Sequence, residues 1–313
     1  MRADAFPAMG SDVQVYVVGG PAQLLVRART RIEGLEALWS RFLPGSELSQ
    51  LNEAAGGEPR RVSPETFELI QRGVQAWRMT SGLFDPTILG DVLRAGYTTS
   101  FDQLPSEPAP GSHDSRLTRG AGDIELDVRT RTVCLPQGVG FDPGGIGKGL
   151  AADFVVAELL AAGADGVCVN LGGDVRAAGT PPEESWAIAI EHPTLPTPAA
   201  VAQLREGAVA TSSRLHRRWQ TGHGSAHHLI DPQRGAPSDT TLWTATAIAA
   251  KGWQAEAFAK AAFLAGPSGL PALERIGVAV LLIVEDGDVL TNGLVSRFID
   301  RSSERLALTE VTA

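Results

Sequence analysis

The sequence predicts an α+β protein in which helices are interleaved with antiparallel strands. Apolar residues recur with helical spacing in four segments, and short strand-like runs follow one another between them. A doubly wound fold would instead alternate strand and helix regularly along the chain. The predicted architecture is therefore one of mixed or antiparallel sheets with packed helices.

The first half of the chain opens with an alternating strand over residues 11–18 and a helix over 21–42, which ends at a Leu-Pro-Gly stop signal. A second helix is predicted over 63–80, because Ser63 precedes Pro64 and acidic residues fill the first turn. Residues 100–120 contain Pro, Ser and Gly without periodicity and predict a surface loop. A short hairpin is expected from residues 124–135.

The second half begins with a helix predicted over 147–162. Four strands are then expected, over 166–170, 174–178, 186–191 and 208–211, with a turn-rich break at 193–198. The last predicted elements are a buried strand, a helix and a further strand, over 242–250, 253–264 and 278–284. No domain boundary is visible, so residues 1–313 are expected to form a single domain of intimately joined sub-domains.

Composition limits the classes of function. The net charge of −9 over 313 residues argues against nucleic-acid binding, because a phosphate backbone would be repelled. No apolar run is long enough for a membrane span, and the amino terminus lacks the features of a signal peptide, so a cytoplasmic protein is expected. Cys134 and Cys168 lie in apolar runs without metal-binding spacing and are expected to be small core residues.

The most informative segment is Asp142-Pro-Gly-Gly-Ile-Gly-Lys-Gly149, which we call the cradle run. Its glycines allow close approach of the backbone to a ligand, and a helix start offers free N–H groups to an anion. Lys148 adds a point charge for a phosphate. The run is not a Walker A loop, which requires Gly at the position of Asp142 and Ser or Thr at that of Gly149. It therefore predicts another kind of phosphate site.

Four further clusters carry polar residues, and each has an ordinary structural explanation when taken alone. The segments 170–174 and 82–87 are typical of tight turns. Thr211 and Ser212 precede an Arg-rich stretch, which suits phosphate oxygens but also a solvated edge strand. His228 and Asp231 could serve as a general base and its orienting group, or could be structural.

The order of these motifs is more specific than any one of them. Met9-Gly-Ser11 comes first, followed by Ser46-Glu-Leu-Ser-Gln-Leu-Asn52 and Gly82-Leu-Phe-Asp-Pro-Thr-Ile88. The cradle run, Asn170-Leu-Gly-Gly-Asp174, Ala210-Thr-Ser212 and His228-Leu-Ile-Asp-Pro232 come after them. Over residues 5–300 this order resembles the ApbE-type FAD:protein FMN transferase family.

That resemblance implies a duplicated α+β architecture of the T-fold type with FAD as substrate. It also implies cleavage of the FAD pyrophosphate and transfer of FMN to a Thr or Ser hydroxyl of a target protein, with release of AMP. His228 would be the general base, with Asp231 as its neighbour. The cofactor-binding residues carried over from the family are Met9, Asn52, Gly82, Phe84, Asp85, Asp142, Gly144, Gly145, Lys148, Asn170, Gly172, Gly173, Thr211 and Ser212.

The family's metal-binding helix is altered in this chain. The family pattern places Asp and Thr one turn apart as Mg²⁺ ligands, with a carbonyl of the cradle run, here that of Gly147. This chain has Glu256 and Lys260 instead. Glutamate keeps a carboxylate ligand, but an ammonium cannot bind Mg²⁺ and repels a divalent ion about 4 Å away. Lys260 either forms a simple i,i+4 ion pair with Glu256 or neutralises the pyrophosphate in place of Mg²⁺.

Three functions remain open from the sequence. The first is an FMN transferase in which Mg²⁺ dependence is weak or absent. The second is an FAD pyrophosphatase, in which water replaces the acceptor and the products are FMN and AMP. The third is a non-catalytic FAD-binding protein. Retention of Lys148, His228 and Asp231 favours catalysis, whereas Glu256 and Lys260 favour binding alone.

Overall fold

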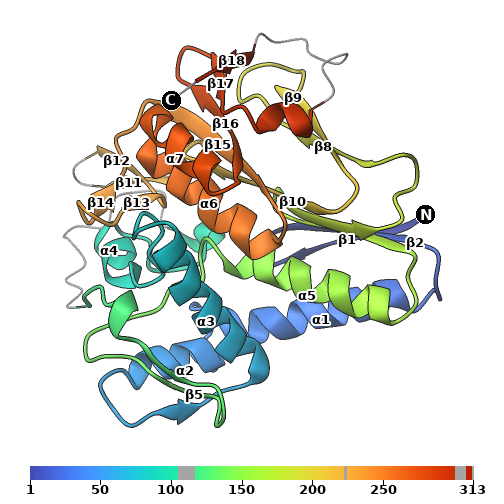
Figure 1. Ribbon diagram of the computed structural model, residues 1–313. Helices are drawn as coiled ribbons and strands as arrows, with labels where there is room; N and C mark the ends of the chain where they lie inside the picture. The colour runs from blue at the N-terminus through green and yellow to red at the C-terminus, as the bar shows by residue number, and fades with distance from the viewer. Residues whose placement is uncertain (105–116, 222–223, 300–307, 312–313) are drawn as a thin grey trace. The chain divides into compact units, whose positions relative to one another are not determined.

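The computed structural model describes residues 1–104, 117–221, 224–299 and 308–311. Figure 1 shows its elements along the chain. The α-helices are α1 (Leu24–Trp39), α2 (Glu47–Glu53), α3 (Pro64–Met79), α4 (Leu89–Arg94), α5 (Gly147–Ala161), α6 (Gly252–Ala265) and α7 (Leu270–Arg275). No helix in these described ranges has the length and hydropathy needed to cross a membrane.

The strands of the first half are β1 (Arg2–Ala8), β2 (Ser11–Val18), β3 (Arg60–Arg61), β4 (Glu125–Asp127) and β5 (Thr132–Cys134). The next strands are β6 (Gly166–Leu171), β7 (Asp174–Gly179), β8 (Trp186–Ile190), β9 (Ala200–Leu204) and β10 (Gly207–Ser213). The last are β11 (Arg218–Thr221), β12 (Gly224–His227), β13 (Ile230–Asp231), β14 (Ala236–Pro237), β15 (Leu242–Ala249), β16 (Ala279–Val284), β17 (Val289–Thr291) and β18 (Leu308–Glu310).

The chain divides into two compact units, and each is assembled from separate stretches of sequence. Unit 1 comprises Met1–Glu33, Lys148–Ser213 and Thr240–Ala313. Unit 2 comprises Gly34–Gly147 and Arg214–Asp239. The cradle run therefore passes from unit 2 into unit 1 between Gly147 and Lys148.

Unit 1 is built on a nine-stranded mixed sheet with the order β1-β2-β6-β7-β10-β15-β16-β17-β18. Its pairs are antiparallel except for the parallel pair β17–β18. One face packs against the β8–β9 hairpin, with Val209 and Ile248 in the shared apolar core. The adjacent pair, Ala210 and Ala247, turns to the other face because side chains alternate along a strand.

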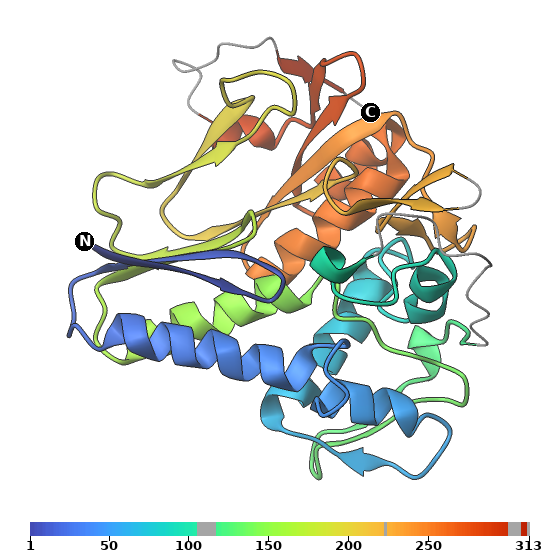
Figure 2. The same cartoon turned by 180° about the vertical axis from the view of Figure 1, so that it is seen from behind.

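Helix α6 packs against β10 and β15 on the alanine-rich face, where small side chains allow a close approach. Helix α5 is joined to α1 by an ion pair between Arg31 Nε and Glu158 Oε1 at 2.8 Å, and the two helices lie side by side in both views (Figure 1 and Figure 2). The sheet, its hairpin and these helices form the layers of unit 1.

Helices α5 and α6 meet backbone to backbone near their amino termini. A Cβ added to Gly149 would lie 2.3 Å from the Gly252 carbonyl oxygen, so no larger residue fits there. Asp153 of α5 accepts hydrogen bonds from the backbone N–H groups of Gly252 and Trp253, at 3.0 and 3.1 Å. It thereby caps α6 from a neighbouring helix and fixes the crossing of the two helices.

Unit 2 contains α2, α3 and α4, the three-stranded sheet β3-β5-β4 and the hairpins β11–β12 and β13–β14. Helix α3 begins as predicted: the Ser63 hydroxyl accepts a hydrogen bond from the Thr66 N–H at 3.1 Å, and Pro64 is the first helical residue. Helix α4 packs on β11–β12, where Trp219 Nε1 donates to the Ala95 carbonyl at 2.7 Å.

The predicted α+β class is confirmed, and the long periodic segments form helices or strands close to their expected positions. The sequence missed the shortest elements. Helix α2 has seven residues and α4 has six, which is too short for a helical period to be recognised. Strand β1 was missed because Pro7 and charged residues interrupt its apolar positions. Of the predicted loop over 100–120, residues 105–116 lie outside the described residues.

The close crossing of α5 and α6 predicts that alanine will change the free energy of unfolding differently at two helical glycines, Gly149 and Gly34. Gly149→Ala should lower the free energy of unfolding by about 1–3 kcal/mol, because its methyl group would overlap the Gly252 backbone. Gly34→Ala, in α1 with no heavy atom within 4 Å of the added Cβ, should be neutral or stabilising. Urea unfolding monitored by circular dichroism measures both, and equal effects of the two substitutions would contradict this account.

Candidate functional site

Lys148 is held by two buried carboxylates of unit 1. It is the second residue of α5, and its Nζ forms an ion pair with Asp174 Oδ2 at the start of β7. The same Nζ lies 3.4 Å from Glu256 Oε1 of α6. The other carboxylate oxygen, Glu256 Oε2, accepts the Gly149 N–H at 2.8 Å. The crossing of α5 and α6 thus brings a lysine and two carboxylates together.

The electrostatics of this cluster are dominated by burial. Burial raises the pKa of Asp174 to about 6; the Lys148 ammonium opposes this rise, and the neighbouring Glu256 carboxylate adds to it. The Thr211 backbone N–H also donates to Asp174 and favours its ionised form. The Lys148 side chain is 21% exposed, against 5% for Asp174, so the ammonium is the member of this pair that solvent or a ligand can reach.

Two turns that carry motifs of the sequence lie next to each other in unit 1, and only that of residues 170–174 was predicted to be a turn. Met9 and Gly10 form the β1–β2 turn and both have positive φ, as a two-residue hairpin turn requires. The Gly172 N–H donates to the Asp12 carbonyl at 2.9 Å, and a Cβ on Gly172 would lie 2.6 Å from Ser11 Cβ. Asn170 Oδ1 accepts the Gly173 N–H at 2.8 Å and closes the β6–β7 turn that leads to Asp174.

Thr211 and Ser212 lie on β10 beside this cluster. The Thr211 hydroxyl forms a hydrogen bond with the Thr246 hydroxyl of β15 at 2.8 Å, and its side chain is exposed. Ser212 is partly buried. The Thr211 backbone N–H thus contacts the Asp174 carboxylate, which in turn pairs with Lys148.

The cradle run in unit 2 is held by hydrogen bonds to its backbone. Asn52 of α2 makes a two-point contact with Phe141: its Nδ2 donates to the carbonyl at 2.9 Å, and its Oδ1 accepts the N–H at 2.7 Å. Asp142 Oδ1 accepts the Gly144 N–H at 2.7 Å, which forms an Asx turn, and Gly145 follows with φ of 128°. Asn52 and Asp142 thus shape the loop before α5.

Sequence reasoning missed Arg41, which lies between α1 and α2. Its Nε is 3.5 Å from Asp142 Oδ2, and both side chains are almost fully buried. The guanidinium also stacks on Phe42 and Tyr97, with its Cζ 4.1 and 4.6 Å from the ring centroids. No local pattern marks this residue, because a single Arg after a helix is ordinary in sequence.

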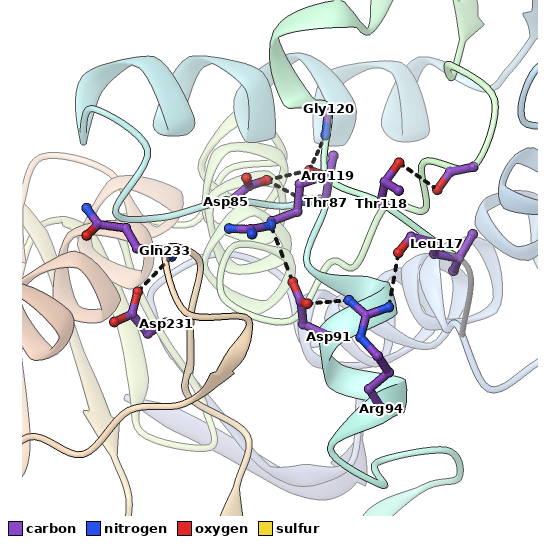
Figure 3. A network of polar contacts seen from close by, with 11 residues as sticks. Asp85, Thr87, Asp91, Arg94, Leu117, Thr118, Arg119, Gly120, Asp231 and Gln233 are labelled. Atoms are coloured by element: carbon purple, nitrogen blue, oxygen red, sulfur yellow. Dashed lines mark hydrogen bonds and ion pairs between the residues drawn. The ribbon is translucent and has the colours of Figure 1, made fainter. Parts of the chain in front are cut away.

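The segment 82–87 forms a compact turn after α3. Gly82 has φ of 82°, and Phe84 is buried, with its N–H bonded to the Thr80 hydroxyl at 3.0 Å. Asp85 Oδ1 accepts hydrogen bonds from the Thr87 N–H and hydroxyl at 2.8 and 2.6 Å. The Thr87 hydroxyl in turn accepts the Gly120 N–H, as Figure 3 shows.

The two adjacent histidines of unit 2 differ in environment. Burial lowers the pKa of His227, with added repulsion from Arg214 and Arg218, and its Nε2 lies 2.9 Å from the Ser238 carbonyl oxygen. His227 is thus held within its own segment by the Ser238 carbonyl oxygen. His228 is partly buried and lies two residues before the start of β13.

Asp231 shapes the turn between β13 and β14. Its Oδ1 accepts the Gln233 N–H at 2.8 Å (Figure 3). Its carbonyl accepts the Gly235 N–H at 2.8 Å. The turn lies against Asp91 of α4, because a Cβ on Gly235 would be 2.8 Å from Asp91 Oδ1. The buried Asp91 pairs with the exposed Arg94 and Arg119, a cluster that the sequence did not indicate.

The residues expected to bind Mg²⁺ do not fit a divalent ion. Both Glu256 oxygens face donors, the Gly149 N–H and the Lys148 ammonium, and Lys260 follows one turn later on α6 with only 5% exposure. Among the described residues, no group of three or more His, Cys, Asp or Glu side chains could hold a metal ion. Mg²⁺ requires about six oxygen ligands in octahedral geometry. Gly147 and Glu256 therefore do not provide the oxygen ligands that Mg²⁺ requires.

The fold and these side chains define a class: an α+β protein with a lysine held by carboxylates at the glycine-rich start of a helix, an arrangement suited to a phosphorylated ligand. The ApbE family model matches residues 9–282. Since this match covers most of the chain, the protein belongs to the ApbE family.

Two relatives named FAD:protein FMN transferase are each 31% identical to this chain. The one from Rhodobacter capsulatus aligns over 257 residues, 80% of this chain and 48% of its own length. The one from Treponema pallidum aligns over 291 residues, 86% of this chain and 79% of its own length. The chain thus spans about half of the first relative and most of the second.

Solved structures agree with this membership. The ApbE protein of Thermotoga maritima has a TM-score of 0.85 and 24% identity, covering 96% of this chain and 99% of its own, and supports the fold alone. The apo flavinyl transferase ApbE of Pseudomonas stutzeri has a TM-score of 0.81 and 26% identity, covering 95% and 96%. Both comparisons support the mixed α+β fold.

The raised pKa of Asp174 predicts a pH-dependent stability. Its pKa is about 6 in the folded protein and close to 3.8 in the unfolded chain, so the folded state binds the proton more tightly. The resulting stabilisation is present at low pH and is lost as pH rises through 6. From about pH 7.5 to about pH 5, the protein should gain about 1 kcal/mol relative to Asp174→Asn. Urea unfolding at both pH values measures this difference, and an equal pH response of the two proteins would refute it.

Proposed function

We propose that the protein is an FAD:protein FMN transferase. The proposal is carried by the ion-paired Lys148 at the glycine-rich start of α5, in a chain of the ApbE family whose relatives bear that name. An ammonium held by carboxylates is fixed in position yet remains 21% exposed, which suits it to a pyrophosphate oxygen.

The reaction is displacement at phosphorus. The hydroxyl oxygen of a Thr or Ser acceptor attacks the phosphorus on the FMN side of the pyrophosphate, and the bond to the bridging oxygen breaks. AMP leaves with that oxygen, and the hydroxyl proton passes to His228. Positioning and charge stabilisation provide most of the rate enhancement in such reactions.

The residues assigned to FAD fall in both units. In unit 1 they are Met9, Lys148, Asn170, Gly172, Gly173, Thr211 and Ser212. In unit 2 they are Asn52, Gly82, Phe84, Asp85, Asp142, Gly144 and Gly145. The internal hydrogen bonds of the cradle run and of the 170–174 turn support a binding role, because they hold backbone N–H groups in place before a ligand arrives.

We assign the general base to His228 because its neighbour His227 is engaged through Nε2 with the Ser238 carbonyl oxygen at 2.9 Å. Asp231 is assigned as a positioning residue, since its carboxylate shapes the turn that follows β13. The acceptor is a protein that presents a Thr or Ser hydroxyl.

We expect His228→Ala to lower the rate of FMN transfer at least about 100-fold while leaving FAD affinity within a few-fold of the unmodified protein. The loss follows from removal of the base that accepts the hydroxyl proton. Mass spectrometry of an acceptor protein after incubation with FAD measures the attached FMN, and fluorescence quenching measures FAD binding. His216→Ala, at an exposed histidine of the same segment, is the matched control.

Two other outcomes would replace the proposal. Release of AMP at the full rate without an acceptor would indicate an FAD pyrophosphatase. Recovery of intact FAD from the protein, with no AMP under any condition, would indicate a flavin-binding protein without catalytic activity.

A further inference from the structure

Lysine is rare in this chain and is concentrated in one place. The sequence contains 24 arginines but only three lysines, at positions 148, 251 and 260. Lys251 is exposed at the start of α6, whereas Lys148 belongs to the carboxylate cluster and Lys260 is 5% exposed. A chain that uses arginine for nearly all its cations thus keeps lysine at one buried position and at one position within a carboxylate cluster, where a compact ammonium differs most from a planar guanidinium.

Lys260 and Glu256 share one face of α6. They are four residues apart, glutamate first, which places their side chains next to each other on the helix. Both are buried, at 5% and 6% exposure, on a helix that packs against β7, β10 and β15. A buried charge is costly unless an opposite charge lies nearby, and the buried Glu256 carboxylate is one helical turn from Lys260.

The charges of this cluster balance without a metal ion. Lys148 and Lys260 contribute two positive charges, and Asp174 and Glu256 contribute two negative ones. A neutral residue at position 260 would leave one excess negative charge, which a divalent cation could then compensate. With Lys260 in place, a divalent cation would instead meet an ammonium in surroundings that screen charge poorly.

We propose that Lys260 is a built-in cation that replaces a divalent metal ion at the Lys148–Asp174–Glu256 cluster, so that this protein binds the FAD pyrophosphate without Mg²⁺. Lys260 and Lys148 together balance the charge of the two carboxylates, and Lys148, whose ammonium has three N–H groups, can direct one of them toward a phosphate oxygen. This inference rests on the proposed function, because it assumes that the ligand is FAD.

The first test is binding of FAD to the full chain after dialysis against EDTA, followed by fluorescence quenching with and without millimolar Mg²⁺. We expect the two dissociation constants to agree within about twofold, because the cluster carries its own cation. A requirement for Mg²⁺ in FAD binding would overturn the inference while leaving the proposed function intact. Failure to bind FAD under both conditions would contradict the proposed function itself.

The second test replaces Lys260 by residues of different charge and size. Lys260→Met keeps the length of the side chain and removes the charge, and should weaken FAD binding in EDTA about tenfold or more. Lys251→Met, at the exposed lysine of the same helix, is the matched control and should bind FAD like the unmodified protein. Unchanged affinity in Lys260→Met would contradict the inference.

The third test uses the metal ion alone as the probe. The double variant Glu256→Asp/Lys260→Thr should bind Mn²⁺, detected by electron paramagnetic resonance, and its FAD affinity should rise when Mg²⁺ is added. The unmodified protein should leave the Mn²⁺ signal of free solution unchanged. Tight binding of Mn²⁺ by the unmodified protein, lost in Glu256→Gln, would refute the replacement of a metal by Lys260. Thermal unfolding of every variant separates a loss of binding from a loss of fold.

Discussion

The crossing of α5 and α6 is the constraint on which the chemistry of unit 1 depends. Gly149 and Gly252 allow the two backbones to touch, and Asp153 caps the second helix from the first. With the helices this close, the Gly149 N–H reaches Glu256, and Lys148 lies near the same carboxylate. A crossing wider by one methyl group would separate these charges, so the packing of small residues sets the electrostatics of the site.

The charged groups at the crossing of α5 and α6 differ in balance from the net charge of the whole protein. The chain is acidic overall, yet the Lys148 ammonium pairs here with the Asp174 and Glu256 carboxylates, and the buried Lys260 follows Glu256 on α6. Burial removes the Asp174 carboxylate from water and disfavours its charged form, which explains its elevated pKa. An anionic ligand approaching this protein would therefore respond to a few fixed groups and little to the net charge.

Unit 2 uses its polar residues differently. Four side chains of unit 2 each accept a hydrogen bond from a backbone N–H group, and each therefore holds a loop in one conformation. They are Asn52, Asp85, Asp142 and Asp231. Residues that a motif comparison assigns to ligand binding are thus also the residues that shape the loops. The two roles are compatible, because a loop fixed in advance loses less entropy when a ligand binds.

The sequence by itself determined the α+β class, the long helices and strands, and the order of motifs that indicates the family. It could do so because periodicity and turn residues are patterns of residues that are close together in the chain. It also revealed the exchange that places Lys260 on α6. Only the tertiary structure joined Lys148 to Asp174 and Glu256, which lie 26 and 108 residues away, and Asn52 to Phe141, 89 residues away. Arg41 and the Asp91 cluster likewise carry no local signal. Such contacts depend on how helices and strands pack, and packing is set by side chains far apart in the chain.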